Sequence, residues 1–173
     1  QFGATLGGPV VIPGLFNGKN KAFFFFNYDG QRRTLPNAVF LGTPIPATDL
    51  ANPANTAGIA KLNSLLTPYT LGFNQDVFLI KNDLQINDKH RLSVRFNSQR
   101  FTGIGLESSG NQVAFEHSGD AKVQTDTLSA SFTSILSPKL LNEFRFQYLR
   151  DDEPSVAYTE NAETVLRQSG ITA

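Results

Sequence analysis

The chain has 173 residues, with 15 basic and 15 acidic side chains, and it contains no cysteine, methionine or tryptophan. A net charge of zero argues against a nucleic-acid partner, because phosphate binding requires an excess of basic residues. Without cysteine there is no disulfide framework and no thiolate metal site. The length suits one domain, and no apolar run is long enough for a membrane-spanning helix. Because Gln1 already lies in a strand-like run, with no initiator methionine or signal peptide before it, we expect an internal fragment of a larger protein.

The first half of the chain predicts two strands followed by a long polar excursion. Residues 2–11 and 22–33 are the expected strands, and the connection at 13–21 contains the turn signal Asn-Gly-Lys-Asn. The excursion, residues 34–76, is rich in Pro, Asn, Thr and Ala. Within it, Asn55 is expected to cap a short helix that places Ile59, Leu62 and Leu66 on one side.

The second half predicts four more strands, arranged as two hairpins. Residues 77–87 and a strand ending near Phe101 are joined by a tight turn at 87–90. A strand at 127–136 and one at 140–150 are joined by a turn at 137–139. A Gly-, Ser- and Asn-rich loop covers 102–122. The polar tail from Asp151 is expected to end in a short helix, 161–169, stopped by Gly170.

The last of these strands separates its two faces most clearly. Its apolar face carries Phe144, Phe146 and Tyr148, while its polar face carries Glu143, Arg145 and Gln147. The connections between strands alternate short and long, as in outer-membrane barrels with tight periplasmic turns and long outer loops. The chain is therefore predicted to be all-β, an antiparallel up-and-down segment of a transmembrane β-barrel with about six strands and its long loops on one side.

Three segments resemble a known family. QFGATLGGPV at 1–10 and KAFFFFNYDGQR at 21–32 look like the early barrel region of TonB-dependent outer-membrane transporters of the Oar-like type. LSPKLLNEFR at 136–145 is similar to another segment of the same barrels. The resemblance implies a full barrel of roughly 22 strands with a plug. Residues 1–173 would then be a partial barrel domain without the plug and the TonB-contacting segment.

The same resemblance implies the location and the partners. They are the outer membrane, its lipid, the TonB complex and a scarce imported solute of unknown identity. Two rival hypotheses stay open. One is a soluble extracellular β-sandwich for binding or adhesion, whose core would be the aromatic strand faces. The other is a surface barrel that serves adhesion or export.

No catalytic motif is complete, and we expect no enzyme activity. Gly103, Ile104 and Gly105 begin a dinucleotide-binding pattern, but Ser108 stands where its third glycine is required. Leu106 stands where a nucleophile elbow around Ser108 would need glycine. The segment therefore predicts a loop without chemistry.

No metal or cofactor site is predicted either. His90 and His117 are the only imidazoles, and the expected topology places them at opposite strand ends, where zinc would lack its three or four ligands. His90 is expected to be a turn residue. Asp151, Asp152 and Glu153 lack the spacing of a calcium loop and are expected to be solvated loop carboxylates.

The charged residues of the polar strand faces have two interpretations. They are Asp29, Lys81, Asp83, Arg91, Arg95, Glu143 and Arg145. The simpler interpretation is cross-strand ion pairing on a wetted inner wall. The functional one is a solute path lined by fixed charges.

Overall fold

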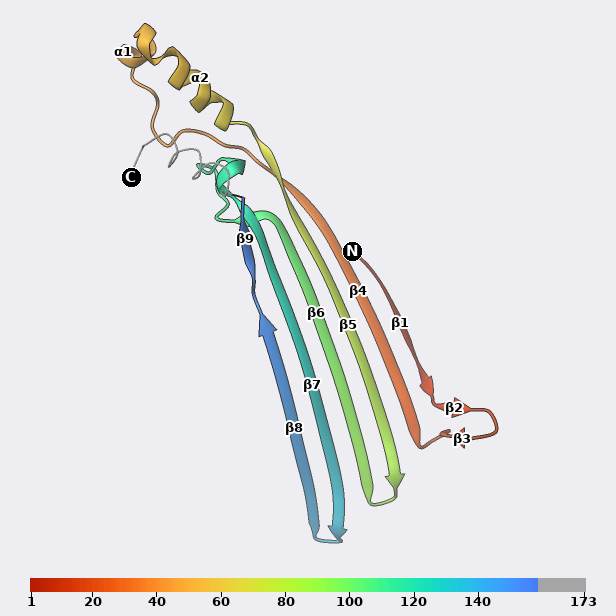
Figure 1. The fold of residues 1–173 in the computed structure, drawn as a ribbon. Coiled ribbons are helices and arrows are strands. Elements are labelled where there is room, and N and C mark those ends of the chain that lie inside the picture. Colours follow the sequence, from red (N-terminus) through yellow and green to blue (C-terminus); the bar gives the residue numbers. More distant parts are fainter. Residues whose placement is uncertain (159–173) are drawn as a thin grey trace. The chain divides into compact units, whose positions relative to one another are not determined.

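The computed structural model describes residues 1–158, in which one large antiparallel sheet dominates (Figure 1). Its strands follow the order β1-β4-β5-β6-β7-β8, with β9 paired to β7, while β2 and β3 form a small separate hairpin. The strands are β1 Phe2–Pro9, β2 Val11–Ile12, β3 Phe16–Asn17, β4 Ala22–Asn37, β5 Tyr69–Asn87, β6 His90–Glu107, β7 Gly119–Ser137, β8 Leu140–Asp152 and β9 Ser155–Ala157. The all-β, up-and-down prediction is confirmed. The sheet is open in residues 1–158, with β1 and β8 as its edges.

The chain divides into two compact units. The first, here called the strand unit, comprises Gln1–Gln31, Gln75–Phe101 and Val123–Glu153. The second, here called the loop unit, comprises Arg32–Asn74, Thr102–Lys122 and, of the described residues, 154–158. The helix expected at 161–169 and its Gly170 stop lie outside the described residues.

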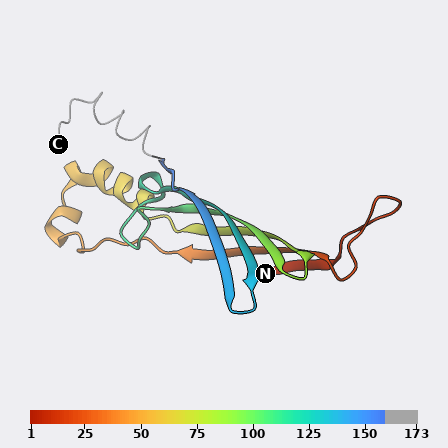
Figure 2. The same ribbon diagram turned by 90° about the horizontal axis from the view of Figure 1, so that it is seen from below.

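In the strand unit, the short connections lie together at one end of the strands (Figures 1 and 2). Asn87 closes the β5–β6 turn, because its side-chain oxygen accepts hydrogen bonds of 2.9 Å from the N–H groups of both Lys89 and His90. This is an Asx-type turn, which asparagine favours. The predicted tight turns are confirmed. The connection at 13–21 is more structured than expected, because it contains most of the β2–β3 hairpin.

The register of β7 and β8 keeps apolar side chains opposite apolar ones. Leu128 faces Tyr148, and Phe132 faces Phe144, while Ser131 faces Arg145. Directly opposed residues of an antiparallel pair project to the same side of the sheet. The two faces predicted for the last strand therefore extend across its neighbour.

Aromatic contacts continue the apolar face toward the other edge of the sheet. The rings of Tyr28 on β4 and Phe78 on β5 stack with centroids 4.8 Å apart, and the ring of Phe2 on β1 meets Tyr28 edge-on at 6.0 Å. Such pairs contribute about 0.5–1.5 kcal/mol beyond the area that they bury. They tie β1, β4 and β5 together on one side.

This apolar face is not the core of a soluble domain. Phe144 is 61% exposed and Tyr148 57% exposed, and the only buried hydrophobic residues among the described ones are Ala22 and Val39. A β-sandwich would bury such aromatic faces between two sheets. The sandwich hypothesis is therefore not supported, whereas a lipid-facing surface accounts for the exposed rings.

Several strands are longer at the long-loop end than predicted. β5 begins at Tyr69 rather than 77, β6 ends at Glu107 rather than near 101, and β4 continues to Asn37. The excursion shrinks to residues 38–68, and the Gly- and Ser-rich loop shrinks to 108–118. The polar tail is predicted to be loop from Asp151, but β8 extends to Asp152 and β9 adds three residues along β7.

The loop unit contains the helices α1 Ala47–Leu50 and α2 Thr56–Leu65, with short 3₁₀ turns at Pro53–Asn55 and Phe115–His117. The predicted short helix is confirmed as α2, but its predicted cap is not. Asn55 precedes the helix without making a side-chain cap, and its amide donates instead to the Asp49 carbonyl. The capping hydrogen bond comes from Asn52, whose side chain accepts from Ala54 N–H of the 3₁₀ turn. None of the helices in residues 1–158 is long and apolar enough to cross a membrane.

Candidate functional site

On the polar face of the strand unit, opposite charges pair along single strands. The Lys81 ammonium on β5 lies 2.8 Å from the Asp83 carboxylate. On β8, the Arg145 guanidinium donates two hydrogen bonds of 2.9 Å to Glu143. Residues two apart on a strand share a face, so the alternation itself brings these partners together. Because all four side chains are at least partly exposed, the pairs matter for the local charge more than for stability.

Contacts between strands on this face are mostly hydrogen bonds rather than ion pairs. Arg91 of β6 lies 4.0 Å from Asp83 of β5, and the Ser131 hydroxyl of β7 donates to Glu143 at 3.1 Å. Asp29 accepts hydrogen bonds from Gln1 and Gln31 and makes no ion pair within residues 1–158. Among the seven charged residues predicted for this face, all within residues 1–158, a cross-strand ion pair is found only between Arg91 and Asp83. The other two ion pairs run along single strands.

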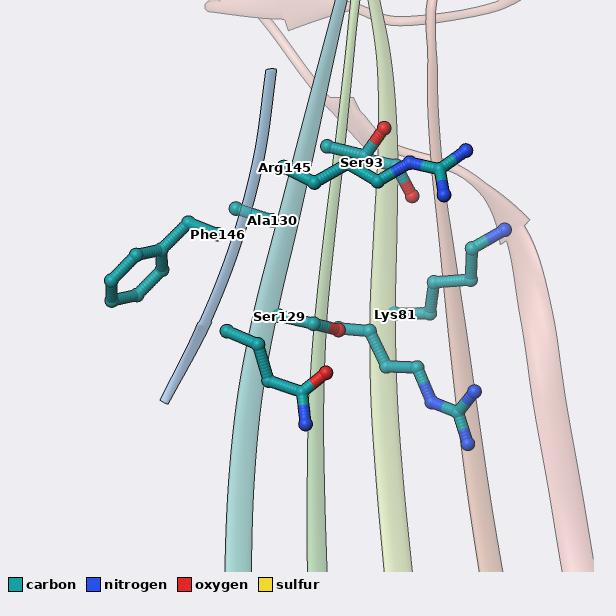
Figure 3. Close-up of a pocket in the computed structure, with 9 residues that line it drawn as sticks. Lys81, Ser93, Ser129, Ala130, Arg145 and Phe146 are labelled. Carbon is teal, nitrogen blue, oxygen red and sulfur yellow. The ribbon is translucent and has the colours of Figure 1, made fainter. Parts of the chain in front are cut away.

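A shallow groove lies among these side chains on β5 to β8. Its lining side chains are Lys81, Ser93, Arg95, Ser129, Ser131, Arg145 and Gln147. Figure 3 shows Arg145 and Lys81 reaching out on one side of the sheet, while the Phe146 ring lies on the opposite side. The alternation in the sequence puts the charged residues and the serines on the same polar face, but only the register places the serines between the charged side chains.

The sequence analysis missed a second polar cluster, which lies on the apolar face. Arg100 of β6 and Asp126 of β7 pair at 2.8 Å, and the Tyr28 hydroxyl donates to Asp76 at 2.7 Å. The register places Arg150 of β8 directly opposite Asp126. The sequence does contain a signal for this cluster. On each of these strands the alternating apolar positions are followed, toward the long-loop end, by a charged residue on the same face. These pairs mark where that face stops being apolar.

In the loop unit, aromatic rings gather around Asp120 of β7. The ring of Phe115 lies 5.4 Å from Tyr69 and 5.0 Å from Tyr158. Asp120 accepts hydrogen bonds from the Gly105 N–H and from the Tyr158 hydroxyl. The bond to Asp120, aided by desolvation, raises the pKa of Tyr158 above its usual value. This cluster fixes the 3₁₀ turn at Phe115–His117 to the neighbouring strands.

The incomplete catalytic motif has a structural role. Gly103 and Gly105 lie within β6 rather than in a loop, and Gly105 has a φ of 66°, in the left-handed region that favours glycine. Ser108, just after the strand, also has a positive φ, of 51°. The segment makes the transition from strand to loop.

The imidazoles and carboxylates do not converge. His90 begins β6 beside the turn, stacks on Phe132 with centroids 5.8 Å apart, and lies 3.0 Å from the Ser134 hydroxyl. Asp151 accepts a hydrogen bond from Thr125 at 2.7 Å as part of β8. In the part of the chain that the structure describes, no three His, Cys, Asp or Glu side chains are grouped so as to hold a metal ion.

A family profile accounts for this two-faced sheet. The profile described as "Outer membrane beta barrel domain" matches residues 1–70 and 44–173, which together cover the whole chain. The chain belongs to the outer membrane β-barrel domain family. No curated protein and no solved structure shows a significant match to it.

Membership of the outer membrane β-barrel family assigns the two faces. In such barrels the lipid-facing band is apolar with aromatic girdles, and the interior is polar. The face of Phe144 and Phe146 is therefore the lipid face, and the groove between Lys81 and Arg145 lies on the interior wall. The protein is located in the outer membrane.

Proposed function

We propose that this chain is part of a TonB-dependent transporter that imports a scarce solute across the outer membrane. The observation that carries the proposal is the polar face of β5 to β8, where charged and hydroxyl side chains line what becomes the interior wall when further strands close the barrel. Support for the finer assignment comes from the resemblance of residues 1–10, 21–32 and 136–145 to Oar-like barrels.

In this proposal, residues 1–173 are a partial barrel domain, and the plug and the TonB-contacting segment lie elsewhere in the full-length protein. The loop at 38–68 contributes to solute capture, because long loops on a rigid scaffold are common binding elements. The interior wall then guides the solute inward past the plug. The barrel segment itself performs no covalent chemistry.

Solute depletion tests the proposal. Cells that carry the gene, cells that lack it and cells with the gene restored are grown in a defined medium. The solutes that disappear from the medium are then compared by mass spectrometry. We expect at least one solute to be depleted only when the gene is present, and only when the cells also contain TonB.

A matched control separates transport from surface binding. Cells poisoned with a protonophore keep the barrel but lose the proton gradient that drives TonB, so depletion should stop. Depletion that is indifferent to both TonB and the protonophore would contradict active import. A loss of cell adhesion in the deletion strain without any change in depletion would favour the adhesion hypothesis.

A further inference from the structure

The floor of the interior groove is built from hydroxyl groups. Ser129 and Ser131 of β7, together with Ser93 of β6, line the groove beneath the longer side chains. The register places Ser129 opposite Gln147 and Ser131 opposite Arg145, so these serines lie on the polar face. Small hydroxyl side chains between long cationic ones leave a depression. Ser131 donates its proton to Glu143 and Ser93 hydrogen-bonds to Asp83, so the free donor at its base is the Ser129 hydroxyl.

Positive charge is in excess along this groove. Lys81 and Arg145 are balanced by Asp83 and Glu143, the acids two residues away on the same strands. Strand β6 contributes two more cations to the same face, Arg91 and Arg95. It contributes no acidic side chain to the groove. Four cations against two carboxylates leave an excess of two positive charges.

Arg95 is the cation without a neutralising partner. Among the described residues it makes no ion pair, whereas Arg91 lies 4.0 Å from Asp83. Arg95 is exposed and lines the groove together with Lys81 and Arg145. A solvated guanidinium with five free donors suits a planar or tetrahedral oxyanion that accepts two hydrogen bonds.

The spacing of the strands suits such an anion. Arg95 and Arg145 lie on β6 and β8, on either side of the hydroxyl-bearing β7. Neighbouring strands lie about 4.8 Å apart, so the two backbones are separated by about 10 Å. Two arginine side chains can converge across this gap on one oxyanion that rests on the Ser129 hydroxyl.

We propose that the groove formed by Lys81, Ser93, Arg95, Ser129, Ser131 and Arg145 is an oxyanion-binding site on the interior wall, and that the transported solute carries phosphate or carboxylate groups. This inference rests on the proposed function, because it assumes that the imported solute passes along the interior wall. Arg95 holds the oxyanion through paired N–H groups, Arg145 adds the N–H groups that its bonds to Glu143 leave free, and Ser129 donates from below. Phosphate and carboxylate offer the same acceptor geometry to this site.

Binding of inorganic pyrophosphate to the full-length protein in detergent tests the site. We expect saturable binding that weakens as salt is added, since the attraction is between exposed charges. Arg95→Gln should weaken binding about tenfold, because it removes a charge-assisted donor pair. Arg95→Lys keeps the positive charge but lacks the paired N–H donors of the guanidinium, so it should weaken binding less than Arg95→Gln does. Citrate as the competitor shows whether carboxylates share the site.

The matched control is Lys139→Gln, which removes one positive charge from the exposed β7–β8 turn, away from the groove. It should leave binding unchanged. Heat-resistant migration in gels confirms that each variant is a folded barrel. The inference is overturned if pyrophosphate does not bind saturably, or if Arg95→Gln binds as the control does.

The two proposals fail separately. If a neutral solute is depleted in a TonB-dependent manner and pyrophosphate does not bind, the import proposal stands and the oxyanion site does not. If pyrophosphate binds through Arg95 but depletion does not depend on the gene, the site is real and the import proposal is wrong.

Discussion

Strands β4 and β8 are both rich in phenylalanine, yet only β8 keeps its rings on one face. Phe144 and Phe146 of β8 lie on the lipid face, separated by Arg145. In β4, four consecutive phenylalanines alternate sides, so that Phe25 lies on the polar face opposite Gly7 of β1, while Phe26 lies opposite Leu6. The interior wall is therefore hydrophilic along β5 to β8 and partly aromatic along β1 and β4. Aromatic content alone does not identify the lipid face, whereas register does.

The sharpest test of this comparison is a charge on the lipid face of β8. Phe146→Arg should lower the free energy of unfolding by about 2–4 kcal/mol if the residue lies near the bilayer centre, because a guanidinium replaces an apolar ring in lipid. Gln147→Arg, one residue along, should be nearly silent. Urea unfolding of the full-length protein in lipid vesicles measures both. Equal losses for the two variants would show that the faces are assigned wrongly.

The same substitution of phenylalanine by arginine in β4 tests which phenylalanines face lipid, because the composition of β4 does not show this. Phe26→Arg should cost about 2 kcal/mol, whereas Phe25→Arg should cost less than about 1 kcal/mol, because Phe25 faces the interior and is 41% exposed. Thermal melting of the two variants in the same vesicles compares them directly. If Phe25→Arg is the more damaging, the register of β1 with β4 is wrong.

The glycines of β1 offer a smaller, steric test of the β1–β4 pairing. A Cβ added at Gly3 would lie 2.5 Å from the Tyr28 carbonyl oxygen, whereas one at Gly8 would have nothing within 4 Å. Gly3→Ala should therefore destabilise the protein by about 1–3 kcal/mol, since the paired backbone has to shift. Gly8→Ala is the control and should have little effect. Similar unfolding midpoints for the two would mean that β1 does not pair as described.

The smallest effect on stability is expected in the loop at 38–68. Replacing residues 42–67 with a short Gly/Ser linker removes α1 and α2 and leaves β4 and β5 intact. The entropy of loop closure changes slowly with length, so heat-resistant assembly should be kept. Solute depletion should fall if the loop captures solute. Loss of assembly would instead make this loop part of the fold.

Much of the strand unit was predictable because its turns are short. The tight turns at 87–90 and 137–139 fix how β5 meets β6 and how β7 meets β8, and the alternation then assigns faces. The same logic predicted which charges share a face, including Arg95 and Arg145. It did not predict the groove, because the position of Ser93 beside Ser131 depends on the pairing of β6 with β7, strands joined by a long connection.

The long-loop ends of the strands were less predictable, for a physical reason. Outward side chains beyond the lipid band of a barrel need not be apolar, and the outward face here already carries the ion pair of Arg100 and Asp126. The hydrogen-bonded ladder continues to Glu107 on β6 while the hydrophobic alternation fades. The sequence therefore predicts loop at 69–74 and 102–107, where the structure has strand. A strand with both faces exposed to water shows little alternation of apolar and polar residues, so the sequence hardly predicts it.

The Asn87 turn also determines how fast different parts of the sheet pair. Because two residues separate β5 from β6, these strands meet after a small search, and hairpins of this kind form in about 1–10 μs. Pairing of β4 with β5 requires residues 38–68 to close first, at an entropic cost that grows with the logarithm of that length. We therefore expect the β5–β6 and β7–β8 hairpins to form as independent units that join later, so that Asn87→Ala slows the first of these steps.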